Sequence, residues 1–395
     1  MNLGTCKSRL DVIHSKTSTK LSTFVATLPS VVEGYVPLRW LLSWPHFSTL
    51  YSGVANFEKV DHVYYKRHLI EHEDGGSNAL DFAVRTTKNL SEAEYESSGD
   101  LNLPPRTAYM TSDESKTIGS DTAGILAVLI HGIAGGSHEN YIRRAVTAIH
   151  EQYKDDGEMS VVAFNARGCA RSKVTSKAYW NAMQTDDIRS ALVFLAEKYP
   201  NRRIVVVGFS LGANILCNYL ARFNEDSKVA LGIAVSNPWV LDRSSDNLES
   251  YWLGRLYSGR MTQGLQRLFK RHSQFLAQHE GVVVSDVMKA RNLREFDDAF
   301  TAKAFGFESA MHYYRAASSA RTVSAIRTNT ILLNAQDDPM ALNEVLPYEQ
   351  VSHNNHLCLL ATKNGGHIGW YGVDDQRWFI DIMMQSIGGM VDGRI

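Results

Sequence analysis

The sequence contains few cysteines, and none of them belongs to a paired motif. Four occur in 395 residues, at Cys6, Cys169, Cys217 and Cys358. The absence of a C-x-x-C pair argues against a zinc site or a disulfide scaffold, and scattered cysteines are typical of a reducing compartment. We therefore expect a cytoplasmic protein that holds no structural metal ion.

Long apolar runs are missing as well. No window reaches about 18 consecutive apolar residues, which predicts no transmembrane helix, and residues 1–30 lack the continuous apolar stretch of a signal peptide. The Ser/Thr-rich, basic start leaves a transit peptide open. Residues 35–54 are the nearest candidate for a membrane segment, but Arg39, His46 and two prolines interrupt them. We expect this segment to pack against the domain, and contact with a membrane surface is the alternative.

Neither sign of charge is in excess. The chain has 41 Lys and Arg residues against 42 Asp and Glu, a formal net charge of −1. No basic field is therefore present to recruit nucleic acid or an anionic membrane. The hydrophobic fraction of 44% is ordinary for a globular protein, and the length suits one large α/β domain with insertions or two domains. The composition does not fix the oligomeric state.

Short apolar runs alternate with helical patterns through most of the chain, which predicts a mostly parallel sheet flanked by helices. The expected strands of this alternation are 125–130, 160–168, 204–207, 229–239, 329–338 and 356–367, and the expected helices include 139–153 and 211–223. A hairpin is predicted around the D-G-G-S turn at 74–77. Residues 87–120 are polar and turn-rich and are expected to form a surface loop.

The alternation stops between residues 240 and 325. This stretch is rich in charge and aromatics and carries little strand signal, so we predict a mainly helical cap inserted between two strands. The expected organisation is an N-terminal extension (1–55), a core (56–239 and 326–395) and the cap (240–325). We expect at least one of six cap aromatics to face a substrate: Trp252, Tyr257, Phe305, Phe307, Tyr313 and Tyr314.

The most informative short motif is IVVVGFSLGAN at residues 204–214. Ser210 follows a buried strand, and Gly208 and Gly212 stand two residues away on either side. G-x-S-x-G is the signature of a nucleophile elbow, in which a tight strand-to-helix turn exposes the serine Oγ and the glycines let neighbouring backbone pass closely. The pentapeptide alone also fits a simple turn with a capping serine.

Two later strand ends supply the groups that such a serine needs. Strand TILLNA is followed by Gln-Asp-Asp-Pro, and strand LCLLAT is followed by NGGHIGW, which contains His367. A carboxylate and then a histidine, each after a later strand, is the order of α/β-hydrolases. Within the acidic pair we favour Asp338, because an acid before proline, three residues past the strand's last small residue, is the usual placement. Asp337 is the alternative, and D-D-P is also good turn chemistry.

An oxyanion hole would complete the set. The loop HGIAGGSHENY follows strand 125–130, and its small residues let backbone N–H groups approach a substrate oxygen. The predicted donors are the backbone N–H groups of Leu211 and Ile133. A dinucleotide loop is disfavoured, because the G-x-G-x-x-G spacing and a phosphate-binding lysine are both absent.

Eight motifs together carry a family resemblance: HGIAGGSHENYIRR, FNARGCARS, GFSLGANIL, SNPW, EFDDAF, FGFESAMHYYRAASS, NAQDDP and GGHIGW. In this order, between about residues 35 and 385, they resemble the α/β-hydrolase family of EMB8-like, YheT-type and ABHD1/ABHD2/ABHD3-type lipases and esterases. The resemblance implies an α/β-hydrolase fold and a serine hydrolase of lipid-like carboxylic esters, such as monoacylglycerols or short to medium acyl esters. It implies Ser210 as nucleophile, Asp338 as acid, His367 as base, and no cofactor.

Two other functions stay open from the sequence. Some fungal relatives in the resembled family move the acyl group to an alcohol, and such an acyltransferase would share every catalytic residue with a hydrolase. A non-catalytic ligand-binding protein on a hydrolase scaffold is the alternative from another class. The expected partner in either enzymatic case is a small acyl ester.

Overall fold

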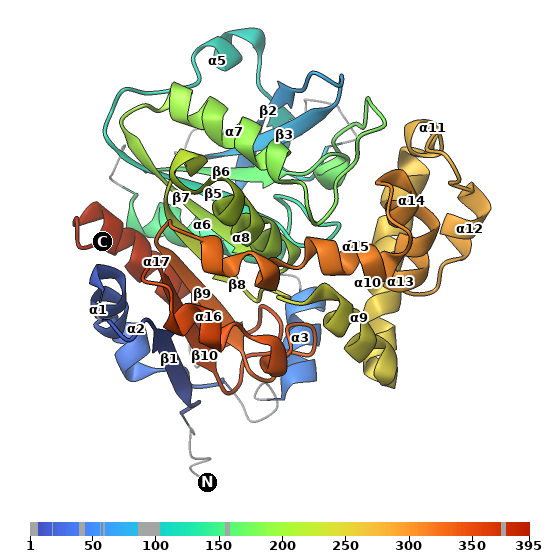
Figure 1. The fold of residues 1–395 in the computed structure, drawn as a ribbon. Coiled ribbons are helices and arrows are strands. Elements are labelled where there is room, and N and C mark those ends of the chain that lie inside the picture. Colours follow the sequence, from blue (N-terminus) through green and yellow to red (C-terminus); the bar gives the residue numbers. More distant parts are fainter. Residues whose placement is uncertain are drawn as a thin grey trace.

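The computed structural model describes residues 7–17, 19–38, 44–55, 57, 60–85, 103–154, 159–372 and 377–395. The described strands form one sheet in the order β1-β10-β9-β8-β7-β5-β6-β3-β2-β4 (Figure 1). Their bounds are β1 Leu10–His14, β2 Tyr64–Glu71, β3 Ser77–Val84, β4 Thr107–Tyr109, β5 Gly124–Ile130, β6 Met159–Asn165, β7 Arg202–Phe209, β8 Val229–Val235, β9 Thr330–Ala335 and β10 Leu357–Thr362. Strands β5 to β10 run parallel, which confirms the predicted sheet type.

Helices cover both faces of the sheet, because its central strands are apolar on both sides. Along β7, Ile204 and Val206 face one core with helices α7 (Thr185–Lys198) and α8 (Leu211–Phe223). Val205 and Val207 face a second core with α6 (Asn140–Gln152) and α17 (Trp378–Val391). This alternation follows from the two-residue period of a strand. The sheet therefore lies between two layers of helices.

Parallel register brings several strand ends to one edge of the sheet. Ile130 of β5 lies beside Gly208 of β7, and Phe209 lies beside Val235 of β8. Val235 in turn lies beside Leu333 of β9. The segments that follow these strands therefore start close together, which is where open α/β sheets place their ligands.

The N-terminal residues contribute to the sheet and to one of its loops. Strand β1 pairs antiparallel with β10, although the sequence places it in an extension. Helices α1 (Lys20–Ala26) and α2 (Pro29–Glu33) follow it, and α3 (Pro45–Val54) packs on the loop after β10. Contact of α3 with the domain agrees with the expectation for this segment, of which residues 39–43 lie outside the described residues. Membrane contact stays a prediction for its exposed side chains Trp44 and Phe47.

The polar segment before β5 is partly structured. It contains β4 and α5 (Ser112–Lys116), so the expectation of a loop across 87–120 is wrong for those residues. A capping box at Thr111 explains the helix, since Thr111 and Glu114 each accept a backbone hydrogen bond from the other. Residues 86–102 lie outside the described residues.

Between β8 and β9 the chain is helical, without a strand among residues 236–329. Its longer helices are α9 (Leu241–Ser250), α10 (Trp252–Arg271) and α15 (Ala310–Ala317); shorter ones are α11 (Ser273–Leu276), α12 (Val284–Lys289), α13 (Leu293–Phe296) and α14 (Ala302–Ala304). Several of them, yellow and orange, group beside the sheet in Figure 1. A further short helix, α16 (Tyr348–Ser352), precedes β10. The boundaries of a cap domain stay a proposal.

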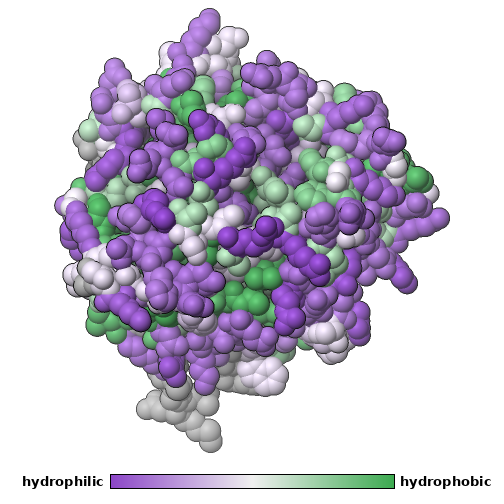
Figure 2. Space-filling model, in the orientation of Figure 1, coloured by the Kyte–Doolittle hydropathy of each residue, from purple (hydrophilic) through white to green (hydrophobic). Residues whose placement is uncertain are grey.

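The surface and the cysteines fit an ordinary globular chain. Hydrophilic side chains cover most of the face shown in Figure 2, with apolar side chains in smaller areas between them. Cys169, Cys217 and Cys358 are buried and form no disulfide, and Cys6 lies outside the described residues. In the described ranges we find no helix that is both long and apolar enough to cross a membrane.

Candidate active site

Ser210 lies on a strained turn between β7 and α8. Its φ of 51° and ψ of −118° are unusual for a residue with a side chain. A Cβ on Gly208 would lie 2.5 Å from the Gly212 oxygen, and one on Gly212 would lie 2.5 Å from backbone oxygens of the β5 end. Both glycines are therefore required by close backbone packing. The turn has the geometry of a nucleophile elbow.

Three of the residues predicted from sequence meet in one hydrogen-bonded chain. His367 Nε2 lies 2.8 Å from Ser210 Oγ, and His367 Nδ1 lies 2.8 Å from Asp338 Oδ2. The Asp338 side chain is fully buried, and that of His367 is 10% exposed. The geometry is that of a serine, a base and an orienting carboxylate.

Backbone N–H groups fix the Asp338 carboxylate. The amides of Met340 and Ala341 donate to its Oδ1 at 2.8 and 3.0 Å. The neighbouring Asp337 has a different role, because its Oδ1 accepts from the backbone N–H of Gly366 at 2.9 Å. Burial, with the nearby Asp338 charge, raises the pKa of Asp337 to about 6. Asp337 thus stabilises the loop that carries His367 and forms no hydrogen bond with the imidazole.

Helix α3 holds the histidine loop from the other side. Thr49 Oγ1 accepts from the His367 backbone N–H at 2.9 Å, and Ser48 Oγ donates to the Gly365 carbonyl at 3.0 Å. Ser236, directly after β8, accepts from the Ile368 N–H at 3.0 Å. Sequence reasoning missed these positioning residues. The run of Ser and Thr in an otherwise apolar helix was the one available signal.

The loop after β5 brings further backbone groups to Ser210. Gly132 approaches so closely that its added Cβ would lie 3.3 Å from Ser210 Cβ. Its own N–H is occupied, since it donates to Tyr141 Oη at 2.9 Å. In the described part of the chain, the N–H groups of Ile133 and Leu211 have no hydrogen-bond acceptor. Both residues also line the cavity in front of Ser210, as an oxyanion hole would require.

A buried ion pair supports this loop. Arg67 of β2 and Asp81 of β3 form two hydrogen bonds of 2.7 Å, and both side chains are fully buried. Ser137, at the far end of the loop, donates to Asp81, and Arg67 donates to the carbonyl of Ala170. The hairpin thereby anchors two loops near the site. Buried carboxylates with paired donors hold geometry tightly.

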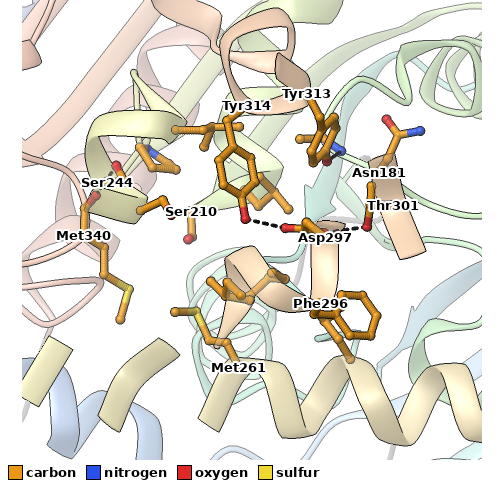
Figure 3. Close-up of a pocket in the computed structure, with 18 of the residues that line it drawn as sticks. Asn181, Ser210, Ser244, Met261, Phe296, Asp297, Thr301, Tyr313, Tyr314 and Met340 are labelled. Atoms are coloured by element: carbon orange, nitrogen blue, oxygen red, sulfur yellow. Dashed lines mark hydrogen bonds between the residues drawn. The ribbon is translucent and has the colours of Figure 1, made fainter. Parts of the chain in front are cut away.

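A cavity of about 110 Å³ opens in front of Ser210 (Figure 3). Its walls come from the ends of β5 and β7, from residues 179–182 before α7, from the helical segment after β8 and from Met340 after β9. Apolar side chains dominate the wall, and they include Leu241, Leu248, Met261, Leu265, Leu293, Phe296 and Met340. Two of the six cap aromatics, Tyr313 and Tyr314, line it, whereas Trp252 is 68% exposed. The cavity can hold an apolar group next to the serine hydroxyl.

Comparisons with known proteins agree with this architecture. The family model described as "alpha/beta hydrolase fold" matches residues 127–370. Among curated proteins, a monoacylglycerol lipase of Saccharomyces cerevisiae is 35% identical, across 90% of this chain and 82% of its own length. The "Medium-chain fatty acid ethyl ester synthase/esterase 2" of the same yeast is 32% identical, across 84% and 80%. Human phospholipase ABHD3 is 25% identical, across 87% and 75%. The chain belongs to the α/β hydrolase family.

Proposed function

We propose that the protein is a serine hydrolase that cleaves carboxylic esters of lipid-like acids through an acyl-serine intermediate. The observation that carries the proposal is the hydrogen-bonded chain Ser210–His367–Asp338 at the wall of an apolar cavity. Relatives named as a lipase, an esterase and a phospholipase support the substrate class. Monoacylglycerols and short to medium acyl esters are the proposed substrates.

In the first half-reaction, Ser210 Oγ attacks the ester carbonyl while His367 Nε2 takes the hydroxyl proton. The Asp338 carboxylate accepts the Nδ1 hydrogen, which keeps Nε2 free to act as the base and stabilises the imidazolium. His367 then gives its proton to the departing alcohol. A water molecule attacks the acyl-serine in the second half-reaction, again through His367, and the carboxylic acid leaves.

The negative charge that develops on the carbonyl oxygen needs donors. The N–H groups of Ile133 and Leu211 are proposed for this role, because they lie at the cavity and have no acceptor among the described residues. One such donor contributes on the order of 3–4 kcal/mol to transition-state stabilisation in other serine hydrolases. The helical segment 240–325 is proposed as a cap that shapes the substrate cavity.

Ser210→Ala tests the proposal. The variant should keep the fold, since one hydroxyl is removed, and should lose ester hydrolysis and labelling by a fluorophosphonate probe. Ser285→Ala, in the exposed part of α12, is the matched control and should behave like the parent protein. Hydrolysis by the Ser210 variant above about one per cent of the parent rate would contradict the nucleophile assignment, because triad serines contribute several orders of magnitude.

Acyl transfer to an alcohol is the second proposed activity. It is favoured by the relative that is named a synthase as well as an esterase. The same acyl-serine would then be attacked by an alcohol in place of water. Product analysis with added ethanol separates the two activities: an ethyl ester reports transfer, and free acid alone reports hydrolysis.

A further inference from the structure

One carboxylate side chain lines the cavity and has no part in the proposed triad. Asp297 is 8% exposed and begins a π-helical turn, Asp297–Thr301, between α13 and α14. Phe296 and Leu293, just before it, belong to the apolar wall of the same cavity. A carboxylate in an apolar wall is costly unless hydrogen-bond donors satisfy it. Short π-helical turns are also frequent at functional sites.

The hydrogen bonds of Asp297 leave part of its capacity unused. Tyr314 Oη donates to Oδ2 at 2.5 Å, and Thr301 Oγ1 donates to Oδ1 at 2.5 Å (Figure 3). A carboxylate offers about four acceptor positions, so two stay open. Burial raises the pKa of Asp297 to about 6, and among the described residues no cation lowers it. An incoming hydrogen-bond donor would therefore be bound strongly.

The cavity wall differs on the two sides of the serine. In Figure 3, Ser210 lies between Met340 on one side and the Asp297–Thr301 pair on the other. An ester bound at Ser210 has two arms, the acyl chain and the alcohol. An acyl chain has no hydrogen-bond donor and suits the methionine side. An alcohol with free hydroxyl groups suits the carboxylate side.

We propose that Asp297 is a specificity-determining residue that accepts hydrogen bonds from free hydroxyl groups on the alcohol part of the substrate, as in a glyceryl ester. This inference rests on the proposed esterase function and names the alcohol class within it. Binding a simple alkyl ester instead leaves two acceptor positions of a buried carboxylate unpaired, which is unfavourable. The site thereby selects polyol esters over alkyl esters of the same acid.

The test compares glyceryl monooctanoate with methyl octanoate on the intact protein. Asp297→Asn should lower kcat/KM on the glyceryl ester relative to the methyl ester at least about tenfold. The reason is that only the glyceryl ester loses a hydrogen bond to a charged group. The two rates are measured separately, so that a loss confined to the glyceryl ester is distinguished from a loss common to both esters. Asp298→Asn is the control, since this neighbouring carboxylate accepts from the Ala310 N–H and does not line the cavity.

Each outcome has a distinct meaning. If the parent protein hydrolyses neither ester, the proposed function fails. If it hydrolyses both and Asp297→Asn leaves the ratio unchanged, or lowers both rates equally, the specificity role alone is overturned. Octanoylcholine is a third substrate: a loss confined to this cationic ester would show that the carboxylate recognises an ammonium group and not hydroxyls.

A measurement on the parent protein covers the case in which the variant does not fold. Asp297 should take up a proton as pH falls through about 6, so the glyceryl-to-methyl ratio should fall there. Any effect of pH on the catalytic steps that the two substrates share changes both rates and cancels in the ratio. The groups around Asp297 are Tyr313 and Tyr314, which burial keeps protonated by raising their pKa values, and the nearby charges are Asp298 and Arg294. A ratio constant between pH 5 and 8 would overturn the proposal.

Discussion

The two adjacent aspartates before Pro339 offer a sharp test of the site. Asp338 contacts the imidazole of His367, whereas Asp337 contacts the Gly366 backbone. Replacing each by asparagine changes a carboxylate to an amide of nearly the same shape. We expect Asp338→Asn to be almost inactive and Asp337→Asn to stay within about tenfold of the parent activity.

The expected magnitude follows from the contacts of Asp338. Its Oδ1 accepts from two backbone amides, so the oxygen of an asparagine would occupy that position. The amide NH₂ would then replace Oδ2, 2.8 Å from His367 Nδ1, and donate to it. Nε2 would carry the remaining ring proton and could not accept the proton of Ser210. A forced wrong tautomer costs about 10⁴ in kcat in a well-studied serine protease, or about 5.4 kcal/mol.

Asp337→Asn preserves an oxygen for the Gly366 N–H and leaves the tautomer of His367 unchanged. Its kcat should stay within about tenfold of the parent value. The assay is hydrolysis of p-nitrophenyl butyrate, with circular dichroism and thermal unfolding to show that both variants fold. Retention of more than a tenth of the parent kcat by Asp338→Asn would refute the reasoning. If Asp337→Asn were the inactive variant, Asp337 and not Asp338 would be the catalytic acid.

Two further predictions concern the support of the site. Arg67→Leu should lower the free energy of unfolding in urea by about 3–5 kcal/mol, because the Asp81 carboxylate stays buried without its ion-pair partner; the exposed Arg9→Leu should leave it unchanged. Gly212→Ala should lower kcat/KM at least about tenfold, because its Cβ would push away the oxyanion loop. The control is Gly259→Ala in α10, where the added Cβ would make only an ordinary van der Waals contact and activity should be kept. The opposite order of activities would contradict the packing argument.

The sequence predicted the sheet and the catalytic candidates because their signals are local. Short apolar runs mark the central strands, and the glycines around Ser210 reflect close backbone contacts within the turn and with the end of β5. The positions of Asp338 and His367 follow from strand ends, since parallel register aligns β8, β9 and β10. Fold and candidate site were thus accessible from short-range patterns and chain order.

Features that depend on distant partners were not predicted. Strand β1 has no strong alternation and is defined by its pairing with β10, about 350 residues away in the chain. In the sequence, Thr49 is only a polar residue within a helix. Its role is visible only in the structure, where the loop of His367 packs on it. Asp297 stands in an Asp-Asp pair that is typical of an exposed turn, and only the packing of the helical segment between β8 and β9 turns one carboxylate inward. Tertiary contacts decided each of these.

The cavity also predicts how the rate depends on acyl chain length. Leu241, Leu248 and Met340 provide an apolar wall beside Ser210, so each added methylene should be removed from water in the transition state. Such burial is worth about 0.8 kcal/mol per methylene, or roughly fourfold in kcat/KM. The cavity volume of about 110 Å³ limits this gain. At about 10–15 Å³ for each water-sized position, it holds on the order of ten such groups, which acyl chain and alcohol share.

We therefore expect kcat/KM on p-nitrophenyl esters to rise from acetate through butyrate and hexanoate, and to level off before about ten acyl carbons. Met340→Ala, which widens the wall opposite Asp297, should move the plateau to longer chains while the acetate rate changes little. The exposed Met288→Ala is the matched control. A steady fall from acetate to octanoate would mean that the acyl chain does not enter this cavity. A plateau that Met340→Ala leaves unmoved would mean that the chain leaves Ser210 along a different wall.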